Sequence, residues 1–216
     1  MLEAVIFDMD GVIIDSEPFF HESEQLVLKK RGHDVPLDYF YQFQGTTHSY
    51  MWGLMKENFD LPDEVSDLVN EATSVREALI EEKGMTAIPH VLEFIDHLST
   101  TDIPLAIASS SPRKDIEKTI EMFDLHDVIT YYVSGNQVEN SKPFPDIFLN
   151  VSSKLNLNPE NCLVIEDSAN GVRAGSAAGM KVIGYRNTNF PAPDHSKADK
   201  VITTFEGLRI EDLQSI

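Results

Sequence analysis

Residues 4–12 read AVIFDMDGV, an apolar run that ends in two acidic residues and a glycine. Consecutive apolar residues without polar alternation are typical of a strand that is covered on both faces, as in a parallel sheet. The run therefore predicts a strand over 4–8 that ends at Asp8, with Asp10 just beyond it. Ligands of open α/β sheets bind beyond the carboxyl ends of the strands, so both carboxylates are candidates for a binding site.

Runs of the same kind recur along the chain. They occupy 105–109 (LAIAS), 162–166 (CLVIE), 181–185 (KVIGY) and, more briefly, 200–202. Amphipathic stretches separate them, with helix-start signals at Pro89, Ser111-Pro112, Pro145 and Ser168. Strand and helix in alternation predict an α/β fold that is built on a doubly wound, Rossmann-like parallel sheet.

Residues 16–84 break this alternation. They contain no convincing strand run, but Ser16-Glu17-Pro18 is a helix start, and a long apolar stripe of helical spacing begins at Val65. We therefore expect an α/β core domain from residues 1–15 and 85–216, with a small α-helical domain at 16–84 inserted after its first strand. The expected core of the helical domain includes Met51, Trp52, Leu54 and Met55.

The composition is that of an acidic globular protein. The 216 residues include 36 acidic and 17 basic ones, and this formal net charge of -19 repels nucleic acid and anionic lipid. No apolar run approaches the roughly 20 residues of a membrane span, and no basic segment precedes the first apolar run, so neither a span nor a secretory signal is predicted. We expect a cytoplasmic monomer without nucleic-acid or membrane partners.

Two residue types that often carry chemistry are given structural interpretations. The seven histidines show no close metal-ligand spacing, so a zinc site is not expected. Cys162 lies in an apolar run and is expected in the core. As the single cysteine it cannot form an internal disulfide, and a reducing compartment is expected. Residues 187–196 (NTNFPAPDHS) are predicted to form a polar surface loop.

Acidic residues gather at the ends of two predicted strands. Asp8 and Asp10 lie at the end of the first run. Glu166 ends the run at 162–166, and Asp167 follows it directly. Magnesium prefers carboxylate and carbonyl oxygens, so Asp8, Asp167 and a backbone carbonyl near Asp10 predict a magnesium site. With the metal on one Asp8 oxygen, the other can attack phosphorus, and Asp10 can protonate the leaving oxygen and later activate water.

Hydroxyl and ammonium groups converge on the same edge. Ser109 ends its strand, and Lys142 lies in a loop just ahead of a helix. Both can bind phosphate oxygens, and the turn at Ser110 offers backbone amides to the same anion. Ser111 is interpreted as the cap of the helix that follows. A nucleophile, a metal and phosphate-binding groups together predict phosphoryl transfer.

These motifs resemble those of the haloacid dehalogenase (HAD) superfamily of phosphotransferases. The stretch Asp8-Met9-Asp10-Gly11-Val12 is similar to its first motif, Ser109 to its second, Ser141-Lys142-Pro143 to its third and Glu166-Asp167 to its fourth. The resemblance runs the length of the chain and is greatest to the β-phosphoglucomutase-like and sugar-phosphatase branch. The helical insertion after the first motif is similar to the small cap domain of this family.

The resemblance implies a covalent mechanism. Asp8 would form an aspartyl-phosphate and Asp10 would be the general acid and base. The magnesium ligands would be Asp8, the main-chain carbonyl of Asp10, and Asp167, with Glu166 in contact with the metal directly or through water. Founding dehalogenases lack a carboxylate at the position of Asp10, which favours phosphate chemistry here. We therefore expect a Mg2+-dependent phosphatase that acts on a small phosphate monoester of the sugar or polyol phosphate class.

Two other functions stay open. One is a β-phosphoglucomutase-type phosphomutase, whose cap loop in that branch carries a lysine before a glycine and an arginine shortly after it. Those places hold Gln44 and His48 here, which favours the hydrolase. The resemblance implies that Gln44, Gly45, Thr46 and His48 face the substrate. The other function is a signalling receiver, which lacks the Asp-x-Asp pair followed by a helical insertion.

Overall fold

The computed structural model describes residues 2–43, 47–214 and 216. The chain divides into two compact units, one formed by Met1–Asp15 with Ala87–Ile216 and the other by Ser16–Thr86. Among the described residues, none of the helices combines the length and the apolar character that a membrane crossing requires.

The larger unit is built on a six-stranded parallel sheet in the order β3-β2-β1-β4-β5-β6. The strands are β1 (Ala4–Phe7), β2 (Leu105–Ser109), β3 (Ile129–Ser134), β4 (Cys162–Glu166), β5 (Lys181–Tyr185) and β6 (Lys200–Ile202). This is the order of the doubly wound Rossmann-type sheet, so the predicted fold class is confirmed. The sequence did not predict β3, which forms an edge of the sheet.

Register places the ends of three strands side by side. Phe7, the last residue of the central strand β1, pairs with Ile107 of β2 and Ile165 of β4. The residues that follow these pairs therefore emerge at the same edge, and the order of the sheet reverses between β1 and β4. In folds of this type the crevice at that point is where ligands bind.

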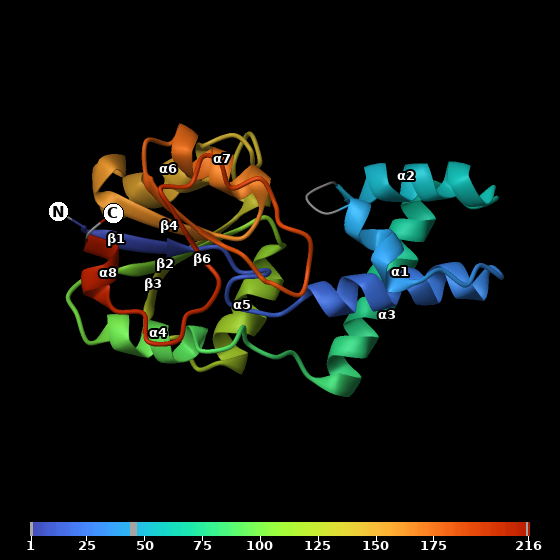
Figure 1. Cartoon of the computed structure of the whole chain (residues 1–216), viewed down its shortest axis with the longest axis horizontal. Coiled ribbons are helices and arrows are strands. Elements are labelled where there is room, and N and C mark those ends of the chain that lie inside the picture. The colour runs from blue at the N-terminus through green and yellow to red at the C-terminus, as the bar shows by residue number, and fades with distance from the viewer. Residues whose placement is uncertain (1, 44–46, 215) are drawn as a thin grey trace. The chain divides into compact units, whose positions relative to one another are not determined.

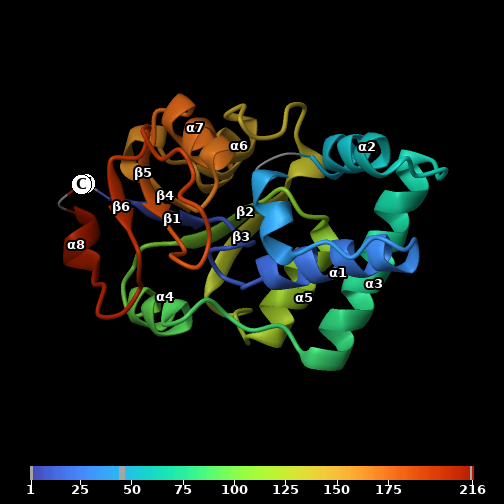
Figure 2. The ribbon, with the colours of Figure 1, turned by 45° about the vertical axis from the view of Figure 1, so that its right-hand side comes forward.

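Helices cover both faces of the sheet (Figure 1). They are α4 (Val91–Ser99), α5 (Arg113–Met122), α6 (Asp146–Leu155), α7 (Ala169–Ala177) and the short α8 (Ile210–Gln214). On one face, α6 and α7 supply Phe148 and Val172 to a buried cluster with strand residues. On the other, Phe94 of α4 meets Phe7 edge-on, with ring centroids 6.2 Å apart. Figure 2 shows the same two layers of helices with the sheet between them.

Three helix starts bear on the sequence interpretation. Ser168 caps α7 as predicted, since its side chain accepts a hydrogen bond from the Gly171 amide. The helix expected to open at Pro89 begins at Val91 instead. His90 stands before it in a left-handed conformation, with φ of 64°, and its side chain makes no capping hydrogen bond. The start expected at Pro145 is confirmed by α6, with Pro145 at the cap position.

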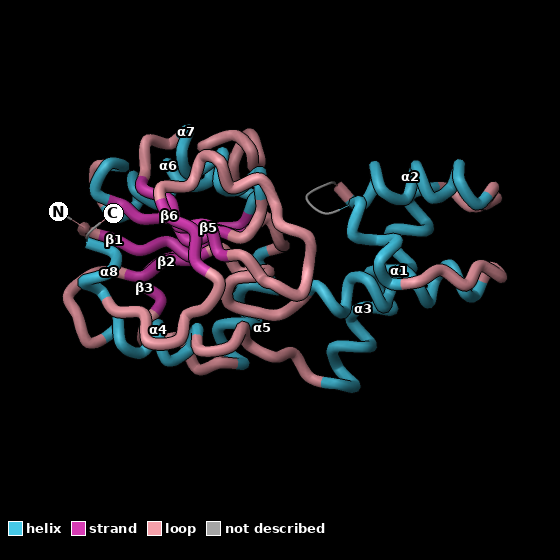
Figure 3. The backbone as a smooth tube through the Cα atoms, in the orientation of Figure 1, coloured by secondary structure: helices cyan, strands magenta, loops and turns pink. Residues whose placement is uncertain are grey.

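The smaller unit is helical, and no strand occurs among its described residues (Figure 3). It consists of α1 (Glu17–Lys30), the 3-10 helix η1 (Leu37–Phe43), α2 (His48–Phe59) and α3 (Val65–Lys83). Trp52 and Met55 are buried in its core, as predicted, with Met51 buried and Leu54 packed against the same cluster. Ion pairs tie the helices together: Arg31 contacts Asp63 and Glu71, both at 2.7 Å.

Candidate active site

A tight turn after β1 positions the first two acids. The Asp8 amide donates to the Ile165 carbonyl at 2.9 Å, which continues the pairing with β4. The chain then turns back on itself, and the Gly11 amide donates to the Ile14 carbonyl at 2.8 Å. Gly11 has φ of 77°, a left-handed value that favours glycine, and any side chain there would overlap the Asp167 carboxylate. The glycine therefore lets the turn approach Asp167 closely.

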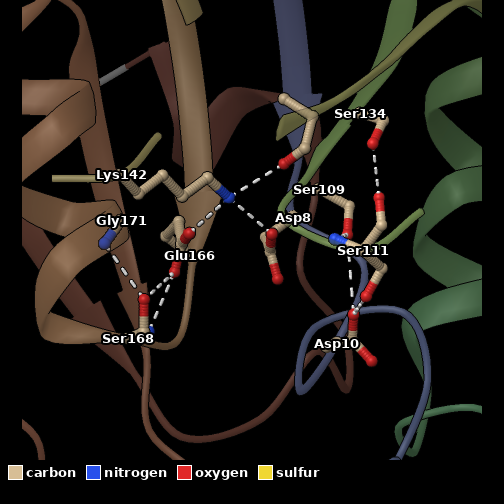
Figure 4. A network of polar contacts seen from close by, with 10 residues as sticks. Asp8, Asp10, Ser109, Ser111, Ser134, Lys142, Glu166, Ser168 and Gly171 are labelled. Carbon is tan, nitrogen blue, oxygen red and sulfur yellow. Dashed lines mark hydrogen bonds and ion pairs between the residues drawn. The ribbon is translucent and has the colours of Figure 1, made fainter. Parts of the chain in front are cut away.

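Lys142 lies between two carboxylates at the strand ends (Figure 4). Its ammonium donates to Asp8 Oδ1 at 2.6 Å, to Glu166 Oε1 at 2.8 Å and to the Ala108 carbonyl at 2.9 Å. The Lys142, Asp8 and Glu166 side chains are only 5%, 8% and 1% exposed. The contacts join the ends of β1, β2 and β4 through one cation, although Asp8 and Lys142 are 134 residues apart in the chain.

Burial and charge set the protonation of this group. Burial raises the pKa of Asp8 to about 8, the Lys142 ammonium acts against that rise, and the neighbouring Glu166 and Asp10 add to it. For Lys142, burial alone would lower the pKa, but the attraction of Asp8 and Glu166 outweighs it and the pKa is raised. Lys142 is therefore a fixed cation, whereas the negative form of Asp8 needs more positive charge than one lysine supplies.

Glu166 is tied to the first turn of α7. Its Oε2 accepts hydrogen bonds from the Ser168 amide at 2.8 Å and the Ser168 hydroxyl at 3.0 Å. A side chain at Gly171 would overlap the Glu166 carboxylate, so this position in α7 must stay small. Both Glu166 oxygens thus have protein partners, Lys142 on one side and Ser168 on the other.

Asp10 is held by hydroxyl groups instead of by a cation. The Ser111 hydroxyl donates to Asp10 Oδ2 at 2.6 Å, and the Ser109 hydroxyl lies 3.5 Å from the same oxygen. Ser109 Oγ also accepts from the Ser111 amide at 3.0 Å. Ser134, at the end of β3, donates its hydroxyl to the Ser111 carbonyl at 2.7 Å. A chain of three serines thus fixes the carboxylate of Asp10.

The interpretation of Ser111 as a helix cap is wrong. The cap position of α5 is Pro112, and no side chain makes a capping hydrogen bond there. A serine before a proline is a common helix start, which is why the sequence suggested it. The hydroxyl turns instead to Asp10, three residues beyond the end of β1.

Three carboxylates form a group that suits a hard metal ion. One oxygen from each of Asp8, Glu166 and Asp167 lies within 4.8 Å of the others. Hard cations such as Mg2+ take carboxylate oxygens, and the burial of Asp8 beside Glu166 favours a cation at this place. The donor set therefore fits the magnesium ion that the sequence suggested.

The other predicted site residues have different surroundings. The Ser110 side chain is exposed, next to the buried Ser109. His48 begins α2 in the helical unit, with its ring centroid 5.2 Å from that of Phe20. Gln44, Gly45 and Thr46 lie outside the described residues. Sequence reasoning missed Ser134, because the strand that carries it was not predicted.

The family profile of haloacid dehalogenase-like hydrolases matches residues 5–185. The chain belongs to this family. It is 31% identical over 182 residues to a phosphorylated carbohydrates phosphatase of Thermotoga maritima, which covers 84% of each protein. It is 30% identical to hexitol phosphatase B of Escherichia coli K12, over 97% of this chain and 96% of the relative.

A solved structure extends the likeness to the fold. The β-phosphoglucomutase of Clostridium difficile superposes with a TM-score of 0.79 at 25% identity, covering 100% of this chain and 96% of that one. Because the profile begins at Val5 and ends at Tyr185, it includes every strand-end residue described above, together with the helical unit between them. The resemblance that the sequence motifs suggested is thus confirmed.

Proposed function

We propose that the protein is a magnesium-dependent phosphatase that hydrolyses a sugar or polyol phosphate through a phosphoryl group carried on Asp8. The observation that carries the proposal is the pairing of two differently held acids at the end of β1. Asp8 accepts a hydrogen bond from the Lys142 ammonium at 2.6 Å, while Asp10 accepts one from the Ser111 hydroxyl at 2.6 Å. A nucleophile and a general acid need such separate environments. The phosphatase names of two relatives support the same reaction class.

The first half of the reaction forms a phosphoryl-enzyme. Asp8 uses the oxygen that Lys142 does not contact to attack phosphorus, and the bond between phosphorus and the alcohol oxygen of the substrate breaks. Asp10 gives its proton to that oxygen, so the alcohol leaves neutral. Lys142 lies beside the attacking carboxylate and stabilises the negative phosphate oxygens, aided by the Ser109 hydroxyl and the backbone at Ser110.

The second half returns the enzyme to its starting state. Asp10, now ionised, takes a proton from a water molecule whose oxygen attacks phosphorus, and the bond between phosphorus and the Asp8 oxygen breaks. Inorganic phosphate leaves, Asp8 is again a carboxylate and Asp10 is again protonated. The short hydrogen bond from Ser111 keeps the Asp10 carboxylate in one place during both proton transfers.

Asp8, Asp167 and the main-chain carbonyl of Asp10 are the groups that would hold magnesium. Glu166 is the third carboxylate of the group and reaches the ion only by sharing an oxygen with Lys142 or Ser168. Bound magnesium supplies positive charge to the phosphate oxygens and to Asp8. That charge is needed in a chain of net charge -19, because the surface would otherwise repel a phosphate ester.

A phosphomutase is the alternative, and the structural likeness to a β-phosphoglucomutase favours it. A mutase must hold a second phosphate, which calls for lysine or arginine in the cap. Gln44 and His48 stand at the places where that branch carries lysine and arginine. We therefore place hydrolysis ahead of transfer between two hydroxyls of one sugar.

The test is a measurement of phosphate release with a panel of phosphorylated sugars and polyols. We expect turnover of at least one of them, and of p-nitrophenyl phosphate, with Mg2+ present, and complete loss in excess chelator. A second assay supplies β-glucose 1-phosphate with a trace of β-glucose 1,6-bisphosphate. Rapid formation of glucose 6-phosphate with little free phosphate would contradict the hydrolase and support the mutase. No turnover of any ester with Mg2+ would contradict both.

A further inference from the structure

We infer that His195 is a positioning residue for the metal-binding carboxylate Asp167. The His195 ring nitrogen Nε2 lies 2.7 Å from the main-chain carbonyl oxygen of Asp167. A carbonyl only accepts hydrogen bonds, so Nε2 carries the proton and donates it to this bond. The bond joins the loop between β5 and β6 to the residue that follows β4. The inference rests on the proposed role of Asp167 as a magnesium ligand.

The β5 strand is shaped to admit the ring. A side chain carbon at Gly184 would lie 2.6 Å from His195 Nδ1, closer than carbon and nitrogen atoms can approach. The histidine ring therefore lies directly on the glycine backbone. Any larger residue at 184 would push the ring away from Asp167, so glycine and histidine act as a matched pair.

The loop that carries His195 is anchored on both sides of the ring. On one side, Asp194 accepts from the Arg173 guanidinium of α7 at 3.1 Å and from the Ser196 amide at 3.1 Å. On the other, the Ala198 amide donates to the His195 carbonyl at 2.9 Å. Ala198 also packs against the buried cluster of the sheet. A ring held this firmly donates a hydrogen bond of fixed direction.

The other ring nitrogen gives independent support. His195 Nδ1 is buried and has no hydrogen-bond partner among the described residues. A buried polar atom without a partner lowers stability, so a histidine that served only to pack would be expected to give way to an apolar ring. Within the part of the chain that the structure describes, the one polar contact of the ring is the bond to Asp167. Holding that carbonyl is thus the property that the histidine side chain provides.

The consequence concerns the approach of Asp167 to the metal. The Asp167 carboxylate must lie against Gly11 to join Asp8, and its main chain must not rotate. A hydrogen bond to the carbonyl restrains that rotation before the ion arrives. Groups that orient metal ligands in this way typically change metal affinity by about 10–100-fold when removed. We expect a loss near the lower end, because a main-chain bond leaves the carboxylate itself intact.

The experiment measures magnesium binding directly, by calorimetric titration of the metal-free protein with MgCl2. His195→Phe keeps the ring and removes the donor, and we expect its dissociation constant for Mg2+ to rise about tenfold. His195→Gln places an amide nitrogen at the same distance along the side chain as Nε2, and we expect the affinity to return to within about threefold of the parent. In phosphatase assays, His195→Phe should need more Mg2+ for half-maximal activity than the parent and His195→Gln do. At saturating Mg2+, its kcat should return to the parent value.

A matched control separates positioning from packing. His97 of α4 also has a buried ring nitrogen without a partner among the described residues, so His97→Phe makes the same chemical change away from the strand ends. We expect it to leave the affinity for Mg2+ unchanged. If His195→Phe is insoluble, His195→Asn replaces it, since its shorter amide also fails to reach the carbonyl.

Each outcome decides the matter. Magnesium binding in the parent with unchanged affinity in His195→Phe overturns the role of His195 and leaves the proposed function standing. Equal losses in His195→Phe and His195→Gln also overturn it, because the donor would then be irrelevant. A parent that binds no Mg2+ removes the metal site of the proposed function, and this inference with it.

Discussion

Each unit of the molecule contains a cation between two carboxylates, and the two clusters differ mainly in burial. In the helical unit Arg31 contacts Asp63 and Glu71, and these side chains keep 16%, 26% and 24% exposure. In the α/β unit Lys142 contacts Asp8 and Glu166 and is 5% exposed. Both cations approach their carboxylates to within 2.8 Å.

The difference in burial reverses the effect on the acids. Hydrogen bonds from Arg31 lower the pKa of Asp63, and bonds from Lys30 and Arg31 lower that of Glu71. Burial raises the pKa of Asp8 to about 8 in spite of its lysine. In the half-buried cluster the cation thus stabilises the charged form of its carboxylates, whereas the buried cluster has too little positive charge to do so for Asp8. A site in that condition favours a metal ion, whose positive charge would then help to bind a phosphate group, and stability alone would not select it.

The largest effect is expected from removing one carboxylate charge in each cluster. Asp8→Asn replaces the nucleophile with an amide of nearly the same shape, and we expect kcat to fall at least about 10⁴-fold, which is ~5.5 kcal/mol in the barrier. Asp63→Asn makes the same change beside Arg31 and should leave kcat within about twofold, since this half-buried ion pair belongs to the helical unit and takes no part in the proposed reaction. Steady-state assays of both purified variants test the comparison.

The melting temperature gives the control for Asp8→Asn. Because burial raises the pKa of Asp8, the neutral amide removes an unfavourable buried charge, and the metal-free variant should melt no lower than the parent. Substantial phosphatase activity in Asp8→Asn, verified by mass spectrometry to be undeamidated, would refute Asp8 as the nucleophile.

Removing the cation should have the next largest effect. Lys142→Met leaves Asp8 and Glu166 buried without a counter-charge, and breaking a buried pair in this way typically costs about 3–5 kcal/mol. We also expect kcat/KM to fall about 10³-fold, because the phosphate oxygens lose the Lys142 ammonium. Arg31→Met is the matched change in the half-buried cluster and should lower the melting temperature less, with kcat/KM unchanged. Denaturant unfolding in chelator, together with kinetics in Mg2+, measures both. Equal melting temperatures for the two variants would show that burial does not set the difference.

A buried acid in the helical unit tests whether burial or location decides the pKa. Glu24 of α1 is 4% exposed, and burial raises its pKa to about 8, with Arg76 acting against the rise and Glu17 adding to it. The folded state therefore holds the Glu24 proton more tightly than the unfolded state, whose pKa is near 4.3. The resulting stability is present at low pH and is lost as the pH rises through about 8.

Glu24→Gln carries no such proton and should lack this dependence. Between pH 6 and 8 the free energy of unfolding of the parent should fall relative to that of the variant by up to roughly 2 kcal/mol. Urea unfolding of both proteins across that range gives the difference directly. If the free energies of unfolding of the parent and of Glu24→Gln change with pH in the same way, Glu24 is solvated in solution. The buried acid Asp8 would then have no counterpart in the helical unit.

Local pattern was enough to predict most of the sheet. The runs at 105–109, 162–166 and 181–185 are apolar except for a polar residue at one end of each, because both of their faces are covered, and each run coincides with a strand. The missed strand, Ile129–Ser134, reads ITYYVS and has exposed or half-buried residues at three of its six positions. An edge strand with an exposed threonine and two half-buried tyrosines gives no continuous apolar signal, so its position became clear only from pairing with β2.

The site was predictable in its members but not in its contacts. Asp8 and Lys142 were found because each stands beside a recognisable motif, whereas the bond between them joins residues 134 positions apart. Ser111 was assigned to a cap because sequence shows which backbone amides lie nearby and not which carboxylate lies across the strand ends. His195 gave no signal at all, since its bond to Asp167 depends on a loop path and on the glycine at 184.

The smallest effect expected concerns the second acid at the end of β1, which is held by a hydroxyl where Asp8 is held by a cation. Ser111→Ala removes the 2.6 Å hydrogen bond to Asp10 and leaves Ser109 at 3.5 Å as the nearest donor to the same oxygen. We expect the carboxylate to lose its fixed orientation and kcat on an alkyl phosphate to fall about tenfold, which is ~1.4 kcal/mol. Turnover of p-nitrophenyl phosphate should change much less, because nitrophenolate leaves without a proton.

The ratio of the two activities is therefore the informative quantity, since it cancels any loss of folded or active protein. Ser99→Ala is the matched control: its hydroxyl donates to the Asp96 carbonyl at the exposed end of α4, so the ratio should stay at the parent value. Equal losses on both substrates in Ser111→Ala would assign the serine to phosphate binding and not to the acid. No loss on either would mean that Asp10 is held well enough without it. A selective loss on the alkyl phosphate would establish that the two acids of the β1 turn are tuned separately, one by charge and the other by a hydroxyl group.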